Sequence, residues 1–442
     1  MKKLLLFSLA AVLLGISANA QSIKKNELDQ YFETLKKQNK VSGVFSIAKE
    51  GNVIYQYAMG EAAANQTIQP NQKFRIGSIS KTFTAAMIFK AIESGRINLE
   101  TRLSTYFPQV PNAGIITIQH LLSHRSGLKS FTDRDDYLQW HTRPQSQTTI
   151  LDKIIKDGFT EGPGLNFEYS NTNYWLLSVI LEKIYNKPYA DILKSQITLP
   201  LGLKNTYVGG KTELVKNSET NSFNMENGNW VQEQYTHPSV PLGAGAIVSN
   251  GNDLSLFINA LMTEKIIAKP YLTQMLALND NVGMGIFAMP YNDKQFLGHT
   301  GSIDGYSSML GYNREDGVTV SVLSNRSDYN LNDVSIALLA GYYGDKLPTV
   351  DTTKAIQVEE KILSTYAGTY ANKDFPLELN VFVENGKLMA QGTGQSAFPL
   401  TAINPYTFIF TPANIKMKFD GKKGTMEFSQ GEYSGFFHRK SS

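Results

Sequence analysis

The segment IGSISKTFTA (residues 76–85) sets Ser78 three residues ahead of Lys81, where a helix is predicted to begin. Residues three apart share one face of a helix, so the lysine amine can lie beside the serine hydroxyl. That hydroxyl becomes a good nucleophile only when a neighbouring base takes its proton, and burial lowers the pKa of a lysine enough to make it such a base. The alternative is a serine that caps a helix next to a surface lysine, and spacing alone favours it.

Ser-x-x-Lys occurs four times in the chain, and the surroundings separate the four matches. Ser22 lies near the N-terminus. Ser46 and its lysine fall in a predicted strand, where residues three apart point to opposite faces. Ser126 is followed by a glycine in a predicted loop. Ser78 alone stands where a helix begins, so we take Ser78 and Lys81 as the candidate nucleophile and base.

The N-terminus has the pattern of a secretory signal peptide, residues 1–20. Lys2 and Lys3 precede an apolar run, and Ala18-Asn19-Ala20 supplies a small-residue cleavage site. The run is too short for a membrane anchor, and the chain has no cysteine to which a lipid could be attached. We therefore expect a periplasmic or secreted protein, cleaved after Ala20.

Charge and residue counts exclude several classes of function. The formal net charge is +3, and it falls to about +1 without the two lysines of the signal peptide, so no basic surface for nucleic acid is expected. The absence of cysteine excludes disulfides, thiolate metal sites and a cysteine nucleophile. The six histidines are scattered, and no His-Glu-x-x-His motif is present. We predict no metal and no cofactor.

Strand patterns lie at both ends of the first 343 residues, with helical patterns between them. The predicted strands are residues 43–48, 52–59, 284–289, 295–300, 308–312 and 319–324. The predicted helices are residues 26–38, 82–91, 174–185, 253–262 and 331–343, with Asn252 or Asp253 as the N-cap of the fourth. This order predicts an α+β fold over residues 21–346, in which one antiparallel sheet is built from both ends, flanked by helices and interrupted by a helical insertion.

The pattern changes after residue 346. Residues 347–357 are polar and carry a proline, which is typical of a linker. Hydrophobic and polar residues then alternate over residues 377–383, and Asn385-Gly386 is a strong hairpin signal. Further short strands are predicted at residues 398–400, 407–410, 415–419 and 425–429. Residues 358–442 are therefore predicted to form a small all-β domain, a barrel or a strongly curved sheet.

Two further short motifs follow Ser78 along the chain. Tyr169-x-Asn171 lies in a predicted loop just before a helix, and His299-Thr300-Gly301 lies on a predicted strand. Each is weak alone, because a tyrosine is more often a packing residue and a lone histidine on a strand is usually structural.

Taken in order, the three motifs resemble those of the serine β-lactamase and penicillin-binding superfamily. The tyrosine of the second motif points to the branch of class C β-lactamases, D-alanyl-D-alanine carboxypeptidases, D-aminopeptidases and related esterases. The stretches LLSHRSGL (residues 121–128) and GPGLNFEYSN (residues 162–171) fit the same branch. The resemblance covers residues 23–343. Residues after 357 resemble the lipocalin-like β domains appended to some members.

This resemblance implies a role for each motif residue. Ser78 would attack a carbonyl carbon and form an acyl-enzyme, Lys81 would help take its proton, and Tyr169 would pass a proton to the leaving group. The implied substrate-binding residues are Asn171, His299, Thr300 and Gly301. The backbone N–H groups of Ser78 and Ser302 would form the oxyanion hole.

His299 departs from class C β-lactamases, which usually have lysine at this position. A histidine carries less positive charge at neutral pH and pairs less strongly with a substrate carboxylate. Arg314 and Arg326 are weaker candidates for binding such a carboxylate.

Three functions remain open from the sequence. The first is an exported serine hydrolase that cleaves an amide or ester through an acyl-serine, with D-amino-acid peptides as one candidate substrate. The second is an esterase or a weak β-lactamase, and the third is a penicillin-binding receptor that acylates without turnover. We also expect a small-molecule or peptide partner, and oligomerisation through the C-terminal domain is left open.

Overall fold

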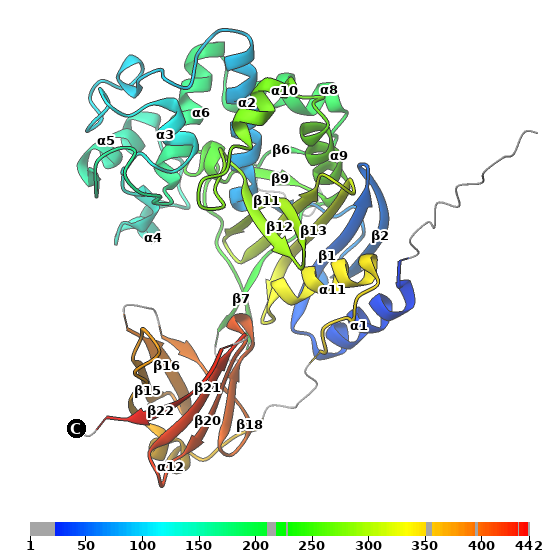
Figure 1. The fold of residues 1–442 in the computed structure, drawn as a ribbon, viewed down its shortest axis with the longest axis vertical. Helices are drawn as coiled ribbons and strands as arrows, with labels where there is room; N and C mark the ends of the chain where they lie inside the picture. Colours follow the sequence, from blue (N-terminus) through cyan, green and yellow to red (C-terminus); the bar gives the residue numbers. More distant parts are fainter. Residues whose placement is uncertain are drawn as a thin grey trace, which may run out of the picture.

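The computed structural model describes residues 23–209, 218–226, 229–350, 356–393, 397–431 and 433–440. The predicted signal peptide, residues 1–20, lies outside them. No helix in these ranges is long and apolar enough to cross a bilayer. Figure 1 shows a larger α+β domain and, below it, a smaller barrel-like domain at the C-terminal end of the chain.

A six-stranded antiparallel sheet organises the larger domain, in the order β10-β11-β12-β13-β1-β2. Its strands are β1 (Val41–Lys49), β2 (Asn52–Met59), β10 (Phe287–Tyr291), β11 (Lys294–Ile303), β12 (Tyr306–Asn313) and β13 (Val318–Ser327). β1 pairs with β13, with Val44 opposite Leu323, so the first and last strands meet in the middle of the sheet. This confirms the prediction that both ends of the domain build one sheet.

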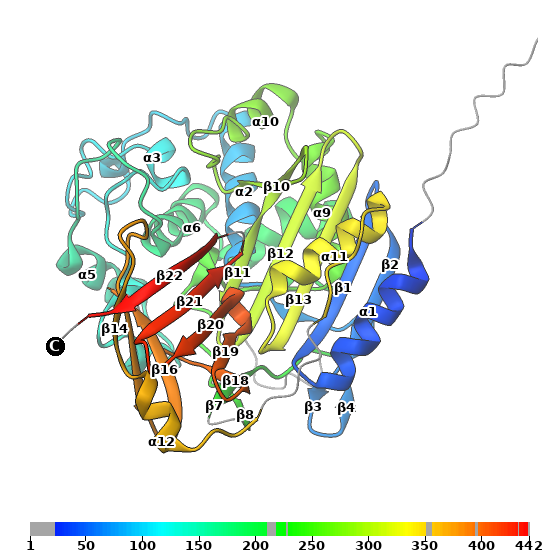
Figure 2. The same ribbon diagram turned by 60° about the horizontal axis from the view of Figure 1, so that its bottom comes forward.

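Helices cover both faces of this sheet. α1 (Lys25–Gln38) and α11 (Leu331–Tyr343) lie side by side on one face, as Figure 2 shows, and α2 (Ser80–Glu93) and α9 (Gly251–Met262) belong to the other layer. Neighbouring residues of β1 pack on opposite faces of the sheet. Val44 belongs to the hydrophobic cluster that contains α2, and Phe45 belongs to the cluster that contains α1 and α11. β1 is therefore buried on both faces, since successive side chains of a strand alternate between them.

Three predicted starts of elements in this domain are wrong. The helix predicted from residue 174 begins at Asn171, so Asn171 lies in the helix and not in the loop before it. The N-cap of α9 is Asn250, whose side-chain oxygen accepts a hydrogen bond from the Asp253 N–H at 2.9 Å, so the helix begins earlier than Asn252 or Asp253. The strand predicted from residue 284 begins only at Phe287, because Gly285 has a φ of +76° and breaks the extended run.

The insertion between the two halves of the sheet is mainly helical. Its helices are α3 (Ile118–Leu122), α4 (Tyr137–Trp140), α5 (Gln147–Asp157), α6 (Asn171–Tyr185), α7 (Tyr189–Leu193) and α8 (Leu199–Leu201), and α10 (Lys269–Met275) follows α9. Short strands form three small sheets: β3 (Glu61–Ala63) with β4 (Gln66–Thr67), β5 (Phe74–Arg75) and β6 (Tyr207–Val208) with β9 (Ile247–Ser249), and β7 (Phe223–Glu226) with β8 (Asn229–Gln232). α6 is deeply buried through Tyr174 and Trp175 and packs on α2, which brings the N-termini of the two helices together.

The C-terminal domain is a nine-stranded antiparallel sheet that curls into a nearly closed barrel (Figure 1). A short helix, α12 (Glu360–Leu363), precedes the strands β14 (Gly368–Ala371), β15 (Leu379–Glu384), β16 (Lys387–Gly392), β17 (Phe398–Pro399), β18 (Thr401–Asn404), β19 (Thr407–Phe410), β20 (Ile415–Asp420), β21 (Thr425–Gln430) and β22 (Tyr433–Arg439). The barrel has a hydrophobic cluster of its own, which includes Tyr370, Met417 and Phe437. Leu347 and Val350, which the sequence places in the linker, pack against the α1 and α11 layer of the larger domain.

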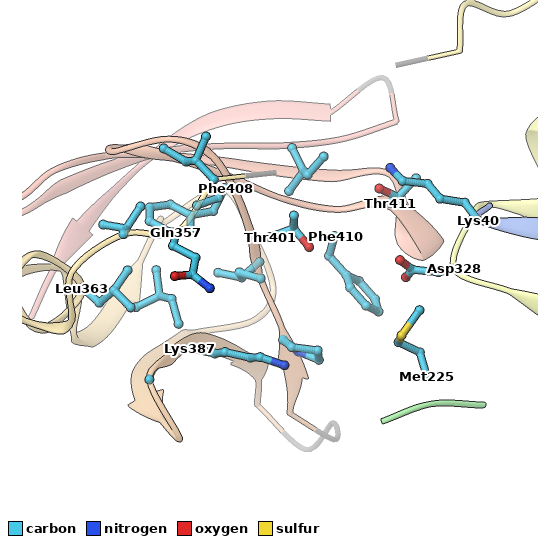
Figure 3. Close-up of a pocket in the computed structure, with 18 of the residues that line it drawn as sticks. Lys40, Met225, Asp328, Gln357, Leu363, Lys387, Thr401, Phe408, Phe410 and Thr411 are labelled. Carbon is cyan, nitrogen blue, oxygen red and sulfur yellow. The ribbon is translucent and has the colours of Figure 1, made fainter. Parts of the chain in front are cut away.

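A cavity of about 1160 Å³ lies between the two domains (Figure 3). Lys40, Met225 and Asp328 line it from the larger domain, and Phe408 and Phe410 line it from the barrel. None of the site residues predicted from the sequence borders this cavity.

Candidate active site

Ser78 lies in a 3₁₀ turn, Gly77–Ile79, that leads directly into α2. α2 begins at Ser80, so Ser78 stands just ahead of the helix and one turn from Lys81. Gly77 has a φ of +49°, and a Cβ at this position would lie only 2.8 Å from the Ser302 backbone nitrogen on β11. A glycine is therefore needed here both for the backbone conformation and for the close approach of the two segments.

The Lys81 amine is completely buried and has three oxygen atoms around it. Nζ lies 2.9 Å from Ser78 Oγ, 2.7 Å from Asn171 Oδ1 and 2.8 Å from the Ala244 carbonyl oxygen. Burial holds the pKa of Lys81 well below its usual value. A neutral amine has two N–H donors and one lone pair; if Asn171 and Ala244 accept from the two donors, the lone pair is left for the Ser78 hydroxyl.

Tyr169 contacts both members of this pair: its hydroxyl reaches Ser78, and the Lys81 Nζ lies over its ring, 4.9 Å from the centroid. Its hydroxyl donates a hydrogen bond to Ser78 Oγ at 2.8 Å. Desolvation of that hydroxyl raises the pKa of Tyr169 to about 12, although 37% of the residue remains exposed. The phenol is therefore protonated at neutral pH and acts as a donor toward the serine.

Asn171 is the first residue of α6 and fixes Lys81 from the side. Its Oδ1 accepts from Lys81, and its Nδ2 donates to Thr132 Oγ1 at 2.9 Å. Its backbone N–H donates to Ser130 Oγ at 3.1 Å. The Asn171 amide therefore holds the lysine amine in this structure.

β11 runs past the serine with its edge partly free. β10 begins at Phe287, opposite Gly298, so the strand edge from His299 onward has no β10 partner. A Cβ at Gly301 would lie 2.9 Å from the Ser78 backbone nitrogen and 2.2 Å from the Ile76 carbonyl oxygen. The backbones of Ser78 and β11 therefore approach closely, and an extended substrate can lie along this edge as an added strand.

His299 contributes an uncharged imidazole to this site. It is 3% exposed, its Nδ1 contacts the Thr300 carbonyl oxygen, and its ring packs edge-to-face on Phe287 at 4.8 Å between ring centroids. Burial lowers the pKa of His299 to about 3. Because the carbonyl can only accept, Nδ1 carries the proton and Nε2 offers a lone pair, which has no partner among the residues that the structure describes.

The structure brings together Ser78, Lys81, Tyr169, Asn171 and His299, which the sequence had placed in separate motifs. Arg314 and Arg326, the two candidates for binding a substrate carboxylate, do not lie in this site. Arg326 donates to Asn39 Oδ1 at 2.6 Å and lies over the Trp230 ring. Arg314 follows the end of β12 that is remote from Ser308, the partner of Gly301.

Several site residues were missed from the sequence. The Ala244 carbonyl lies in a 3₁₀ turn, Leu242–Ala244, and a backbone acceptor leaves no signal in a sequence. Ser130 and Thr132 follow shortly after the stretch LLSHRSGL, which was noted without a role for its histidine, His124. His124 stacks on Tyr169 with 4.4 Å between ring centroids.

Within the described ranges, no group of three or more His, Cys, Asp or Glu side chains is placed to hold a metal ion. The polar groups around Ser78 Oγ are an amine and a phenol, which suit proton transfer during attack on a carbonyl carbon.

Comparisons with known proteins agree with this chemistry. Residues 28–342 match the family model described as Beta-lactamase. Penicillin-binding protein 4* of Bacillus subtilis (strain 168) is 27% identical over 431 residues, which cover 90% of this chain and 94% of that protein. The structure of D-amino acid amidase from Ochrobactrum anthropi SV3 with L-phenylalanine matches with a TM-score of 0.60 and 27% identity, over 68% of this chain and 91% of that chain. The octameric penicillin-binding protein homologue from Pyrococcus abyssi shares the fold over 93% of this chain and 99% of that chain, with a TM-score of 0.65 and 22% identity. The chain therefore belongs to the beta-lactamase family of serine hydrolases.

Proposed function

We propose that this protein is an exported hydrolase that cleaves an amide or ester bond through an acyl-serine at Ser78. One observation carries the proposal: Ser78 Oγ lies 2.9 Å from a buried lysine amine and 2.8 Å from a tyrosine hydroxyl. Export to the periplasm or the medium rests on the signal-peptide pattern of residues 1–20.

In the acylation step, the Ser78 proton passes to the neutral Lys81 amine while Oγ bonds to the substrate carbonyl carbon. The carbonyl oxygen becomes an oxyanion, which the backbone N–H groups of Ser78 and Ser302 stabilise. The bond to the leaving group then breaks, and the leaving nitrogen or oxygen takes the Tyr169 proton. Tyr169 recovers a proton from Lys81, which leaves both side chains as they began.

Deacylation uses the same side chains in reverse order. A water molecule loses a proton to the neutral Lys81 amine and bonds to the acyl carbon. The bond from that carbon to Ser78 Oγ breaks, and the proton returns to the serine. The products are a carboxylic acid and the free enzyme.

His299 favours substrates that present no carboxylate to β11. The imidazole is buried and uncharged, so it offers a carboxylate no ion pair. We therefore propose amides or esters of D-amino acids as the leading substrate class, ahead of D-peptides with a free carboxylate. The similarity to a D-amino acid amidase supports this choice.

A fluorophosphonate or penicillin probe tests the nucleophile. We expect one equivalent of label on Ser78 and none in Ser78→Ala. Ser46→Ala is the matched control, because Ser46 belongs to another Ser-x-x-Lys match and its Oγ has no partner within the described ranges. Label that persists in Ser78→Ala contradicts the assignment.

Turnover separates the remaining alternatives. Nitrocefin, p-nitrophenyl acetate, a D-alanine amide and a D-alanyl-D-alanine peptide are compared in parallel. We expect the highest kcat/KM with the D-alanine amide or with the ester. A burst of one equivalent with no further product from any substrate indicates a receptor instead of an enzyme.

A further inference from the structure

His124 contacts three consecutive residues, of which Tyr169 is the central one. Its backbone carbonyl accepts a hydrogen bond from the Glu168 N–H at 2.8 Å, and its Nδ1 accepts one from the Ser170 N–H at 3.1 Å. Its ring stacks on the Tyr169 ring, with centroids 4.4 Å apart and an interplanar angle of 26°. Tyr169 is therefore held through the backbone on both sides and through one face of its ring.

The His124 backbone adopts an uncommon conformation to make these contacts. It has a φ of +55°, in the left-handed region that residues other than glycine rarely adopt, and it is 1% exposed. With this backbone conformation, the carbonyl and the ring of His124 both face residues 168–170. Unusual backbone conformations that persist in a buried site are often linked to function.

The contacts also fix which ring nitrogen carries the proton. Nδ1 faces two donors, the Ser170 N–H and the Asn173 side-chain amide, the latter at 3.4 Å. The Asn173 amide is oriented by Ser126, whose hydroxyl donates to Oδ1. Nδ1 must therefore be the acceptor and Nε2 the protonated atom. Burial holds the pKa of His124 well below its usual value, which keeps this form at neutral pH.

We propose that His124 is a positioning residue that holds the Tyr169 hydroxyl against Ser78 Oγ for proton delivery to the leaving group. The proposal rests on the proposed function, because it concerns the same proton transfer. His124 acts through Tyr169: its ring packs on Tyr169 and on the rings of Phe167 and Tyr174, and its Nδ1 faces the Ser170 N–H and the Asn173 amide.

This role predicts losses that depend on the leaving group. A p-nitrophenolate ion leaves without a proton, whereas an alkyl amine must be protonated as it departs. If His124 only supported the fold, its replacement would slow the release of both leaving groups equally. If His124 positions the proton donor, its replacement slows the release of the amine from the amide and leaves the release of p-nitrophenolate from the ester nearly unchanged.

The test compares the first-turnover release of the leaving group from the p-nitrophenyl ester and from the alkyl amide of one N-acyl D-amino acid. First-turnover release is measurable whether or not the acyl-enzyme is hydrolysed afterwards. Tyr169→Phe sets the reference, and we expect it to slow the amide about 100-fold and the ester by less than about fivefold. His124→Phe keeps a ring but loses the acceptor, and we expect the same pattern with a loss of about 10-fold to about 50-fold on the amide.

His124→Asn provides the conservative comparison. Asparagine adopts a positive φ more readily than most residues, and its side-chain oxygen can replace Nδ1 as an acceptor. We expect it to recover part of the amide rate that His124→Phe loses. His141→Asn is the matched control, because His141 also stacks on a tyrosine, Tyr137, and its Nδ1 contacts the Leu138 carbonyl; we expect no change in either rate.

Equal losses on ester and amide in both His124 variants, or no loss on either substrate, overturn the proposal. Labelling of Ser78 by a fluorophosphonate shows that each variant retains a folded site. If Tyr169→Phe does not slow the release of the amine from the amide, Tyr169 is not the proton donor. The proposed role of His124 is then wrong as well. If Tyr169→Phe is selective and the His124 variants are not, only the positioning role fails.

Discussion

The Lys81 amine lies 2.9 Å from Ser78 Oγ, and it also contacts two carbonyl oxygens, at 2.7 and 2.8 Å. One belongs to the Asn171 side chain and the other to the Ala244 backbone. A buried lysine without such partners would lose its hydration without compensation. If these two acceptors take the N–H donors of the neutral amine, its lone pair is left for the serine proton.

Lys81→Arg is expected to abolish acylation of Ser78. A guanidinium group is always protonated in proteins and has no lone pair to accept the serine proton. We expect the rate of probe labelling to fall by more than about 100-fold, as for the loss of a general base. Stopped-flow labelling with a chromogenic ester measures it. Lys90→Arg, on the same helix, is the control, and a Lys81→Arg variant that still labels rapidly rules out Lys81 as the base.

The rate of acylation is expected to rise with pH through the lowered pKa of Lys81. The neutral amine is the active base, so activity is lost as pH falls and the amine becomes protonated. Asn171→Leu removes one acceptor that favours the ammonium form, and we expect this acid limb to move to lower pH while the maximum rate falls about 10-fold. The pH profile of kcat/KM for one neutral ester measures both effects. An acid limb that stays in place shows that another group titrates.

The motif residues could be predicted because three short motifs follow one another in the order that the superfamily resemblance requires, and because Ser78 stands where a helix begins. Ser78 precedes α2, Tyr169 precedes α6, and His299 lies where β11 loses its neighbour. The antiparallel sheet could be predicted from the chain order of the strand and helix patterns, because the spacing of hydrophobic residues indicates which face of each element is buried.

The supporting contacts could not be predicted. Ala244 acts through its carbonyl oxygen, which every residue possesses, and the stacking of His124 on Tyr169 depends on tertiary packing between distant segments. The N-cap of α9 could not be assigned from the sequence, because Asn250, Asn252 and Asp253 lie within four residues and are all good capping residues.

Gly301→Ala is expected to damage the oxyanion hole. The new Cβ would lie 2.2 Å from the Ile76 carbonyl oxygen and 2.9 Å from the Ser78 nitrogen, so β11 and the serine turn must separate. We expect kcat to fall about 100-fold to about 1,000-fold, the range for loss of one oxyanion donor. Gly298→Ala is the control, because its Cβ would meet the Leu310 carbonyl oxygen on the neighbouring strand instead. Equal losses of kcat in both variants would point to general strain in the sheet.

His299→Lys is expected to change the substrate preference. A lysine ammonium at this end of β11 can pair with a substrate carboxylate, which the uncharged imidazole cannot. We expect the ratio of kcat/KM for a D-alanyl-D-alanine peptide to that for a D-alanine amide to rise about 10-fold. His299→Gln, which adds no charge, should leave the ratio near that of the wild type. The same ratio in all three proteins would show that His299 does not face the substrate carboxylate.

A chain that ends at Val350 is expected to fold and to keep its acylation rate. Among the described residues, the hydrophobic cluster of the barrel shares no member with the two clusters of the larger domain, and Leu347 and Val350 stay with the larger domain. The predicted site residues all precede this end. We expect the rate of Ser78 labelling to change less than about twofold and the midpoint of thermal unfolding of the larger domain to stay within about 2 °C, the shift that roughly 1 kcal/mol would cause in a domain of this size. Size-exclusion chromatography of both forms shows whether the barrel also joins copies of the chain, because removal of an oligomerisation domain lowers the apparent mass by more than the mass of the barrel. Loss of labelling in a truncated protein that unfolds cooperatively would mean that the barrel supports the active site directly.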